Sequence, residues 1–295
     1  MHRGRKIFLV AFGTKDLKKS AKRLRLQAQN SKFYDDIKIF DNEFFDKDMN
    51  FMVEKLIKDK KVRGYGYWIW KPYFILRVLE EIEYGDIINY MDIGCHIIKK
   101  NSRRFHEYIN LISNEKKWLL PFQYKIIDSN LSKNFNYPNR EEYKFTKSDL
   151  LNYFGFLSDK SILETPQYWA GNFFIKKTDD SIKFIKEWLN IFYERFDLVD
   201  DTTSKIKNHK DFIENRHDQS VFSILCKKNN LDSLSAYECD WAILNHKRTW
   251  DHNIDSPILA KRDLDYGILK RFLNRQKKTF KRIKRKLFGE IKKIN

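Results

Sequence analysis

Residues 64–96 read GYGYWIWKPYFILRVLEEIEYGDIINYMDIGCH, and this stretch decides the fold. Lys71-Pro72 begins a helix, because proline is tolerated in a first turn, where its missing N–H would have no partner. Apolar residues continue at helical spacing through residues 74–82, and Gly85 ends the helix. Residues 86–91 are mostly apolar and typical of a strand buried on both faces of an α/β sheet. The stretch therefore predicts a helix that leads into a buried strand.

A lone carboxylate, Asp92, follows the carboxyl end of that strand. Ligands of open α/β sheets bind in the crevice outside the carboxyl ends of the strands. Gly94 follows two residues later, and a glycine lets a ligand approach the backbone closely. We therefore predict a ligand site at Asp92, with an Asp-Ile-Gly turn that merely ends the strand as the alternative.

The composition indicates a folded protein with an ample core. The chain has 295 residues, of which 42% are hydrophobic and 16% aromatic, which fits one large domain or two small ones. We expect no membrane span, because no run of about 20 apolar residues occurs, and no secretory signal. The cysteines Cys95, Cys226 and Cys239 match no zinc or disulfide framework. Together these features predict a reducing, cytoplasmic setting.

The basic residues are concentrated at the C-terminus. The net charge is +18, and residues 268–295 carry 12 Lys and Arg against one acid, Glu290. Apolar residues recur among these bases at three- and four-residue steps, which predicts a basic amphipathic helix that lies on an anionic membrane surface. A docked or solvated final helix and a nucleic-acid-binding arm are the alternatives. We expect a main domain over residues 1–262 and a tail over 263–295 that binds the inner face of the membrane peripherally.

The first elements indicate a nucleotide-binding α/β domain. Residues 6–12 form a buried strand, 17–30 a helix and 37–40 the next strand, an order typical of such domains. Residues 125–148 have little periodicity and predict a long surface excursion. The remaining predicted elements are helices at residues 52–60, 103–113, 150–156, 181–196 and 218–228 and strands at residues 118–123 and 167–176.

Several enzyme classes are disfavoured because their motifs do not occur. The sequence has no glycine-rich phosphate loop of either standard spacing, no GxSxG elbow and no HExxH pair. Polar residues at strand and helix ends remain as candidates for chemistry. They are Lys71, Asp92, His96, Gly171, Asn172, His217, Asp218, Gln219 and His246.

Five segments taken together resemble a known family. They are a WKPY helix that leads into a strand ending YMDIGC, a WAGNFFI strand, an RHDQSVFSIL helix and a late NHKR. This order is similar to bacterial GT-A glycosyltransferases, in particular a group found in capsule and lipopolysaccharide clusters, over about residues 5–250. The resemblance implies a GT-A-like, Rossmann-like mixed sheet flanked by helices. It also implies transfer of a hexosyl group from a nucleotide-sugar, a UDP-sugar above all, to a glycan or lipid-linked glycan acceptor.

A non-catalytic basic protein that binds nucleic acid or an anionic membrane is the alternative function. It is disfavoured because carboxylates at strand ends discourage contacts with phosphates unless a metal intervenes. We therefore expect no nucleic-acid partner.

The resemblance also implies a metal site and a catalytic pair. The strand-end motif of GT-A enzymes is Asp-x-Asp, which holds a metal on the donor diphosphate; residues 92–94 read Asp-Ile-Gly, so the second carboxylate is missing. By resemblance, Asp92 and His246 would hold Mn²⁺ or Mg²⁺. Asp218 and Gln219 match the Asp-Gln pair that related transferases place at a helix start facing the sugar. Asp218 would be the base if the enzyme inverts, with a simple cap of the helix as the alternative.

The predicted donor site gathers residues from three segments. Lys71 would stabilise the anionic diphosphate as it leaves. The aromatics of residues 65–70 could stack on a base or sugar, with packing into the core as the alternative. Asn172 could contact a substrate or belong to a strand bulge, and His96 and His217 are interpreted as structural. The donor-binding set is Lys71, Tyr67, Trp68, Asp92, Gly94, Gly171 and Asn172.

Overall fold

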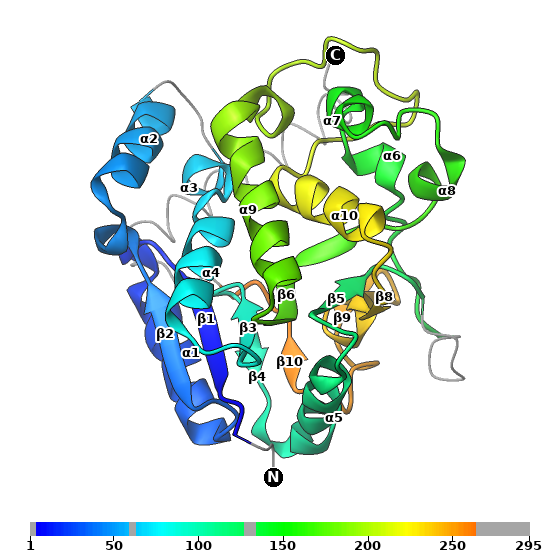
Figure 1. Ribbon diagram of the computed structural model, residues 1–295. Helices are drawn as coiled ribbons and strands as arrows, with labels where there is room; N and C mark the ends of the chain where they lie inside the picture. The colour runs from blue at the N-terminus through cyan, green and yellow to red at the C-terminus, as the bar shows by residue number, and fades with distance from the viewer. Residues whose placement is uncertain (1–3, 59–62, 127–133, 264–295) are drawn as a thin grey trace.

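The computed structural model describes residues 4–58, 63–126 and 134–263 (Figure 1). A six-stranded sheet forms its centre, in the strand order β2-β1-β3-β6-β5-β7. Strand β6 runs antiparallel to its neighbours β3 and β5, whereas the β1–β2, β1–β3 and β5–β7 pairs are parallel. The pairs β10–β4 and β8–β9 form separate two-stranded sheets. The strands are β1 Ile7–Phe12, β2 Asp36–Phe40, β3 Ile87–Met91, β4 His96–Ile97, β5 Leu119–Gln123, β6 Tyr168–Lys176, β7 Leu234–Ser235, β8 Ala242–Leu244, β9 Lys247–Thr249 and β10 Ile258–Leu259.

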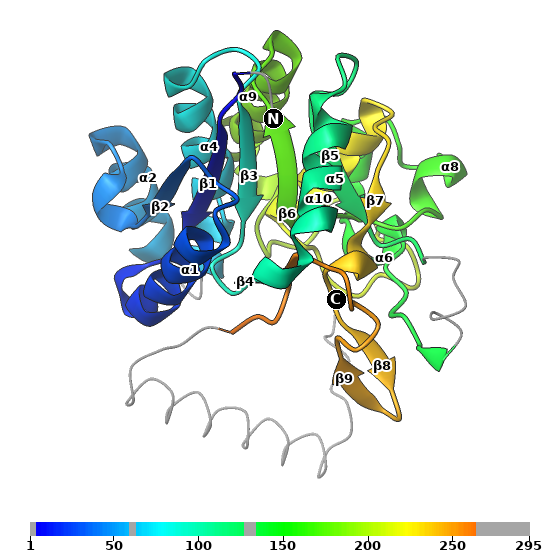
Figure 2. The same cartoon turned by 90° about the horizontal axis from the view of Figure 1, so that it is seen from below.

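Helices cover both faces of this sheet, as Figures 1 and 2 show. Strand β1 is buried throughout, because Phe8 and Val10 pack on the side of α4, α9 and α10, while Ile7 and Leu9 pack against α1 and α5. The predicted class, a mixed α/β sheet flanked by helices, is therefore confirmed. The α-helices are α1 Lys18–Ser31, α2 Lys47–Lys58, α3 Gly64–Tyr67, α4 Trp70–Glu81, α5 Ser102–Ser113, α6 Glu142–Phe145, α7 Ser148–Tyr153, α8 Lys160–Leu163, α9 Asp179–Glu194 and α10 Asp218–Lys228.

Two helix boundaries differ from the prediction for identifiable reasons. Helix α2 begins at Lys47 rather than near residue 52, because the Asp46 carboxylate accepts a hydrogen bond from the Met49 N–H and caps the first turn. Helix α4 ends at Glu81, ahead of Gly85. Gly85 instead occupies a left-handed turn, with φ of 91°, where its N–H donates to the carbonyl of Lys177.

The predicted surface excursion over residues 125–148 is wrong for its second half. Glu142 has no exposed surface, and its carboxylate accepts hydrogen bonds from Thr146, Gln167 and Ser223. Lys227 of α10 completes this network, with Nζ 2.6 Å from Glu142 Oε2. The segment is polar because it packs through hydrogen bonds. A buried polar network leaves no periodic pattern of apolar residues in the sequence, so its burial could not be predicted.

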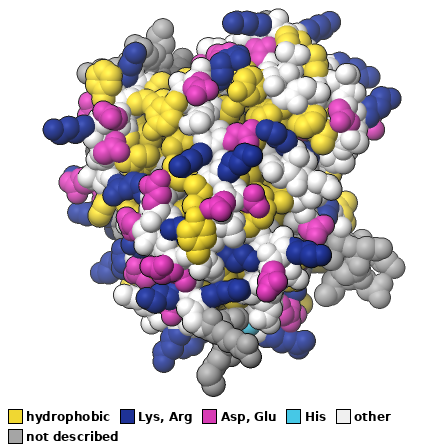
Figure 3. Space-filling model, in the orientation of Figure 1, with side chains coloured by type: hydrophobic (Ala, Val, Ile, Leu, Met, Phe, Trp, Pro, Cys, Tyr) yellow, Lys and Arg dark blue, Asp and Glu magenta, His cyan; other side chains and the backbone are white. Residues whose placement is uncertain are grey.

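Charges of both signs are interspersed on the face shown in Figure 3. None of the helices described is long and apolar enough to cross a bilayer. The predicted amphipathic helix of residues 268–295 lies outside the described residues.

Candidate active site

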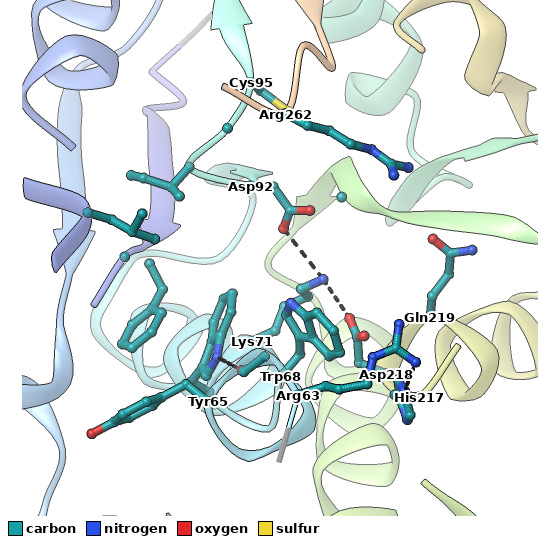
Figure 4. A pocket seen from close by; sticks show the side chains of 18 of the residues that line it. Arg63, Tyr65, Trp68, Lys71, Asp92, Cys95, His217, Asp218, Gln219 and Arg262 are labelled. Carbon is teal, nitrogen blue, oxygen red and sulfur yellow. Dashed lines mark hydrogen bonds and ion pairs between the residues drawn. The ribbon is translucent and has the colours of Figure 1, made fainter. Parts of the chain in front are cut away.

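A cavity of about 800 Å³ opens beyond the carboxyl ends of β1 and β3 (Figure 4). It lies where the fold predicts a ligand site, since the loops after neighbouring parallel strands meet at this edge of the sheet. Its lining comprises Phe12, Gly13, Thr14, Asp16, Leu17, Arg63, Gly64, Tyr65, Trp68, Trp70, Lys71, Asp92, Ile93, Gly94, Cys95, Trp169, Gly171, Glu214, Arg216, His217, Asp218, Gln219, Ala260 and Arg262.

The ammonium of Lys71 joins the walls of this cavity. Lys71 projects from the first turn of α4, and its side chain is only 3% exposed. Its Nζ lies 2.5 Å from Asp218 Oδ2 and 3.5 Å from Asp92 Oδ1, and donates to the Ala170 carbonyl at 3.0 Å. Burial by itself lowers the pKa of Lys71, but Asp218 and then Asp92 outweigh it and raise that pKa. The ammonium is therefore charged at neutral pH.

Asp92 is fixed in place directly after β3. Its N–H donates to the Gly171 carbonyl at 2.8 Å, and the Tyr90 hydroxyl donates to its Oδ1 at 2.8 Å. The Asp92 side chain is 39% exposed and faces the cavity, as Figure 4 shows. The predicted position at a strand end is confirmed, and the carboxylate is held by neighbours from several elements.

At the two glycines of the predicted site, other parts of the same chain approach the backbone closely. A Cβ on Gly171 would lie 2.3 Å from Trp169 Nε1 and 2.8 Å from Asp92 Oδ2. A Cβ on Gly94 would lie 3.0 Å from the Cα of Arg262, and the Gly94 carbonyl accepts from the N–H of Asp263. Both glycines line the cavity, and both leave no room for a side chain.

Helix α10 presents the predicted catalytic pair at its start. Asp218 is the first residue of the helix, and its side chain is 6% exposed. Burial raises the pKa of Asp218 to about 6, although Lys71 acts in the opposite direction. Gln219 lines the cavity and donates through Nε2 to Gln167 Oε1 at 2.9 Å. The two side chains therefore reach the same cavity as Asp92.

His217 holds the turn before α10 in a strained conformation. Its φ of 56° and ψ of −120° lie outside the regions that non-glycine residues favour. Its Nδ1 donates to the Val199 carbonyl at 2.6 Å, its Nε2 lies 3.0 Å from Arg63 Nη1, and its ring stacks on Trp68. Burial lowers the pKa of His217. The imidazole therefore fastens the start of α10 to the aromatic loop.

The aromatic loop before α4 divides between cavity and core. Tyr65, Tyr67 and Trp68 all have positive φ, which turns the chain tightly. Tyr65 and Trp68 line the cavity. Tyr67 is buried, and its ring packs 5.7 Å from that of Phe196 and 4.7 Å from that of His217. Trp68 is thus placed as predicted, whereas Tyr67 is a core anchor.

The structure does not bring two other predicted residues to the cavity. Asn172 is fully buried in β6, where its Oδ1 accepts from Asn89 Nδ2 at 2.8 Å. Its Nδ2 lies 4.0 Å from the Sγ of the buried Cys239, so the side chain is enclosed in the core and does not face the cavity. His246 is exposed in the turn between β8 and β9 and is absent from the cavity lining.

Three arginines that line the cavity were not among the predicted site residues. They are Arg63, Arg216 and Arg262. Arg216 directly precedes His217 and Asp218 in the quoted RHDQSVFSIL segment, so its place in the sequence indicated that it could lie near the site. No local pattern marks the other two, because Arg63 lies in an irregular loop and Arg262 reaches the cavity after the chain returns beside Gly94.

The side chains that surround Asp92 do not fit as ligands of the expected Mn²⁺ or Mg²⁺. Asp92 Oδ1 already contacts Lys71 and Tyr90, and Asp218 is paired with the same lysine. His246, the expected second ligand, is elsewhere, and within the described residues no group of three or more His, Cys, Asp or Glu side chains is arranged to hold a metal. These cations favour several oxygen ligands around one point, and this site places an ammonium there.

No family model matches this chain, and no curated protein matches it. Similar solved structures include a glycosyltransferase involved in the glycosylation of the major capsid of PBCV-1, with a TM-score of 0.46, 9% identity, and 86% of this chain and 91% of that chain covered. Mouse xyloside xylosyltransferase 1 has a TM-score of 0.40 at 11% identity, covering 79% and 87%. The galactosyltransferase LgtC, solved with donor and acceptor sugar analogs, has a TM-score of 0.35 at 13% identity, covering 79% and 75%. At these TM-scores the likeness assigns no function to the chain.

Proposed function

We propose that this protein is a glycosyltransferase that moves a sugar from a nucleotide-diphosphate donor to a glycan acceptor. The observation that carries the proposal is the meeting of Asp92, Lys71 and Asp218 in one cavity at the carboxyl ends of the parallel strands. Arginines and aromatic rings line the same cavity, so anionic and ring-shaped parts of one ligand both find partners there.

The proposed reaction exchanges two bonds at the anomeric carbon of the sugar. The bond from that carbon to the diphosphate oxygen breaks, and a bond to the acceptor hydroxyl oxygen forms. In an inverting reaction the hydroxyl proton passes to Asp218, whose pKa of about 6 suits a base that works near neutral pH. The diphosphate leaves with both electrons of its bond, and the cations of the cavity stabilise that charge.

The cavity offers distinct places for the parts of the donor. Gly13 and Thr14, which follow β1, stand at the edge where α/β folds commonly bind nucleotides. Tyr65 and Trp68 supply ring surfaces on which a base or a sugar can stack. Gln219, with its amide fixed by Gln167, faces the same space. A UDP-sugar is the donor that the sequence resemblance favours.

The resemblance and the basic tail together support a setting in cell-surface polysaccharide synthesis. A capsule or lipopolysaccharide glycan carried on a lipid is reached at the bilayer. We therefore place the enzyme in the cytoplasm, held peripherally at the inner face of the membrane by its tail, where basic residues favour anionic lipids.

Nucleotide release by the purified full chain tests the function. UDP-, GDP- and ADP-sugars, with CMP-sugars as the monophosphate comparison, are each supplied without an acceptor and, in parallel, with extracted lipid-linked glycans. One donor should release its nucleotide, and Asp218→Asn should reduce the rate at least about 100-fold, the usual contribution of a general base. Asparagine keeps an oxygen that accepts from Lys71, and the Asp92 carboxylate, 3.5 Å from Nζ, still compensates the ammonium, so the variant should still fold and bind the donor.

Asp232→Asn is the matched control, because Asp232 has an 81% exposed side chain and is not among the residues that line the cavity. It should react like the unmodified chain. Failure of every donor both to react and to raise the melting temperature would refute the function.

A further inference from the structure

The charge of Lys71 is already used within the protein. Its Nζ donates to Asp218 Oδ2 and to the Ala170 carbonyl, and it also contacts Asp92 Oδ1. An ammonium has three N–H donors. These partners occupy the N–H donors of Lys71 and neutralise its charge. Little hydrogen-bonding capacity or uncompensated charge therefore remains for a phosphate. Lys71 also fills the place between two carboxylates that a divalent cation would take.

Arg216 carries a half-buried charge whose nearest carboxylate is distant. Its side chain is 19% exposed at the cavity wall, its guanidinium lies 4.0 Å from the centre of the Phe145 ring, and the carboxylate that approaches it, Glu214, is 4.0 Å from its Nε. Burial, and then the charge of Arg140, lower the pKa of Arg216 to about 10. An anion in the cavity would compensate this guanidinium.

Arg262 brings a second guanidinium to the same space. Its backbone is seated on Gly94, whose carbonyl accepts from the next N–H, and Figure 4 shows its side chain reaching across the cavity on the side of Asp92 toward Gln219. The charge of Arg262 also contributes to lowering the pKa of Arg216. Like charges held together at the wall of a cavity favour an anionic occupant.

On the basis of the proposed transferase function, we propose that Arg216 and Arg262 bind the diphosphate of the donor and that no divalent cation takes part. Guanidinium groups match phosphate oxygens through paired N–H donors. Lys71 then acts as a positioning residue whose ammonium holds the carboxylates of Asp92 and Asp218 on either side of it. The diphosphate charge would thus be stabilised by the chain itself, which agrees with the absence of a second carboxylate from residues 92–94.

Calorimetric titration of the full chain with UDP and with inorganic pyrophosphate tests this. Both should bind equally well, within about twofold, in EDTA and in Mn²⁺. Arg216→Met and Arg262→Met should each weaken both ligands at least tenfold in either buffer. Arg248→Met is the control, because Arg248 packs over Trp241 at 4.2 Å and is not part of the cavity lining, and it should bind like the unmodified chain.

The other possible results of the titrations decide against the arginine site or against the transferase function. Binding that EDTA abolishes, that Mn²⁺ restores and that Asp92→Asn removes would establish a metal site and overturn the inference. Arginine variants that keep their melting temperature and bind normally would also overturn it. Binding of pyrophosphate alone, through the arginines, with no nucleotide-sugar accepted, would keep the anion site and refute the transferase. Absence of binding by both ligands under all conditions would overturn the arginine site, while the transferase would still be decided by the panel of donors.

Discussion

At the scale of single residues, the ammonium of Lys71 sets the geometry of the cavity. It contacts residues of β6 and α10 and the carboxylate that follows β3. Removal of one partner from a buried ion pair is usually costly, about 3–5 kcal/mol, because the remaining charge is left without compensation. A Lys71 variant would therefore report on folding as much as on chemistry, and variants at the cavity wall are more informative.

Gly171 is a position where one methyl group should disturb the site. In Gly171→Ala the new Cβ would lie closer than 3.0 Å to both Trp169 Nε1 and Asp92 Oδ2, so both side chains must shift. We expect a loss of about 1–3 kcal/mol in the free energy of unfolding, as for other overpacked sites. Nucleotide release should fall at least tenfold, since Asp92 is displaced. Denaturant unfolding and the release assay measure the two effects.

Gly155→Ala is the control, because a Cβ there meets nothing within 4 Å and Gly155 does not line the cavity. Its φ of 77° strains alanine, so stability should fall while activity stays. Full activity in Gly171→Ala would show that the position of Asp92 does not matter for the reaction.

At the scale of elements, a buried ion pair fastens α6 to α10. Lys227 and Glu142 are 4% and 0% exposed, with Nζ 2.6 Å from Oε2. Lys227→Met should cost about 3–5 kcal/mol in the free energy of unfolding, because it leaves a buried carboxylate without its counter-charge. The double variant with Glu142→Gln should cost less than the sum of the single changes. Urea unfolding of the four proteins measures both quantities.

Lys228, which follows Lys227, provides an exposed ion pair for comparison with the buried one. Lys228 pairs with Glu187 at the same distance, 2.6 Å, but their side chains are 46% and 30% exposed. Lys228→Met should therefore cost at most about 1 kcal/mol, as for other surface pairs. Equal losses at the two lysines would contradict the buried arrangement of α6.

The elements that sequence could predict are those whose signal is local. Strand β1 is a continuous apolar run, α4 has a proline in its first turn, and α10 begins at the predicted residue. Lys71, Asp92 and Asp218 were found because they stand at the ends of such elements. Arg262, by contrast, reaches the cavity only after the chain returns beside Gly94, and no local pattern encodes that return. Burial of polar groups, as at Glu142, is equally invisible to periodicity.

At the scale of the whole molecule, the basic tail should control where the protein is held. Deletion of residues 264–295 should leave nucleotide release unchanged but weaken binding to phosphatidylglycerol vesicles at least 100-fold, since each base near an anionic surface contributes about 1 kcal/mol. Vesicle co-sedimentation at low and high salt measures this, with phosphatidylcholine vesicles as the uncharged control. Unchanged sedimentation of the shortened chain would place the membrane contact in the main domain.

The wide separation along the chain of the groups around Lys71 has a consequence for synthesis. The lysine and its partner Asp218 are 147 residues apart, and Ala170 lies between them in sequence. A chain emerging from the ribosome therefore completes β1, α4 and β3 long before the carboxylate of α10 is available. Until then the cavity around Lys71 is incomplete, so a truncated translation product that ends before α10 would lack the wall that Asp218 and Gln219 supply.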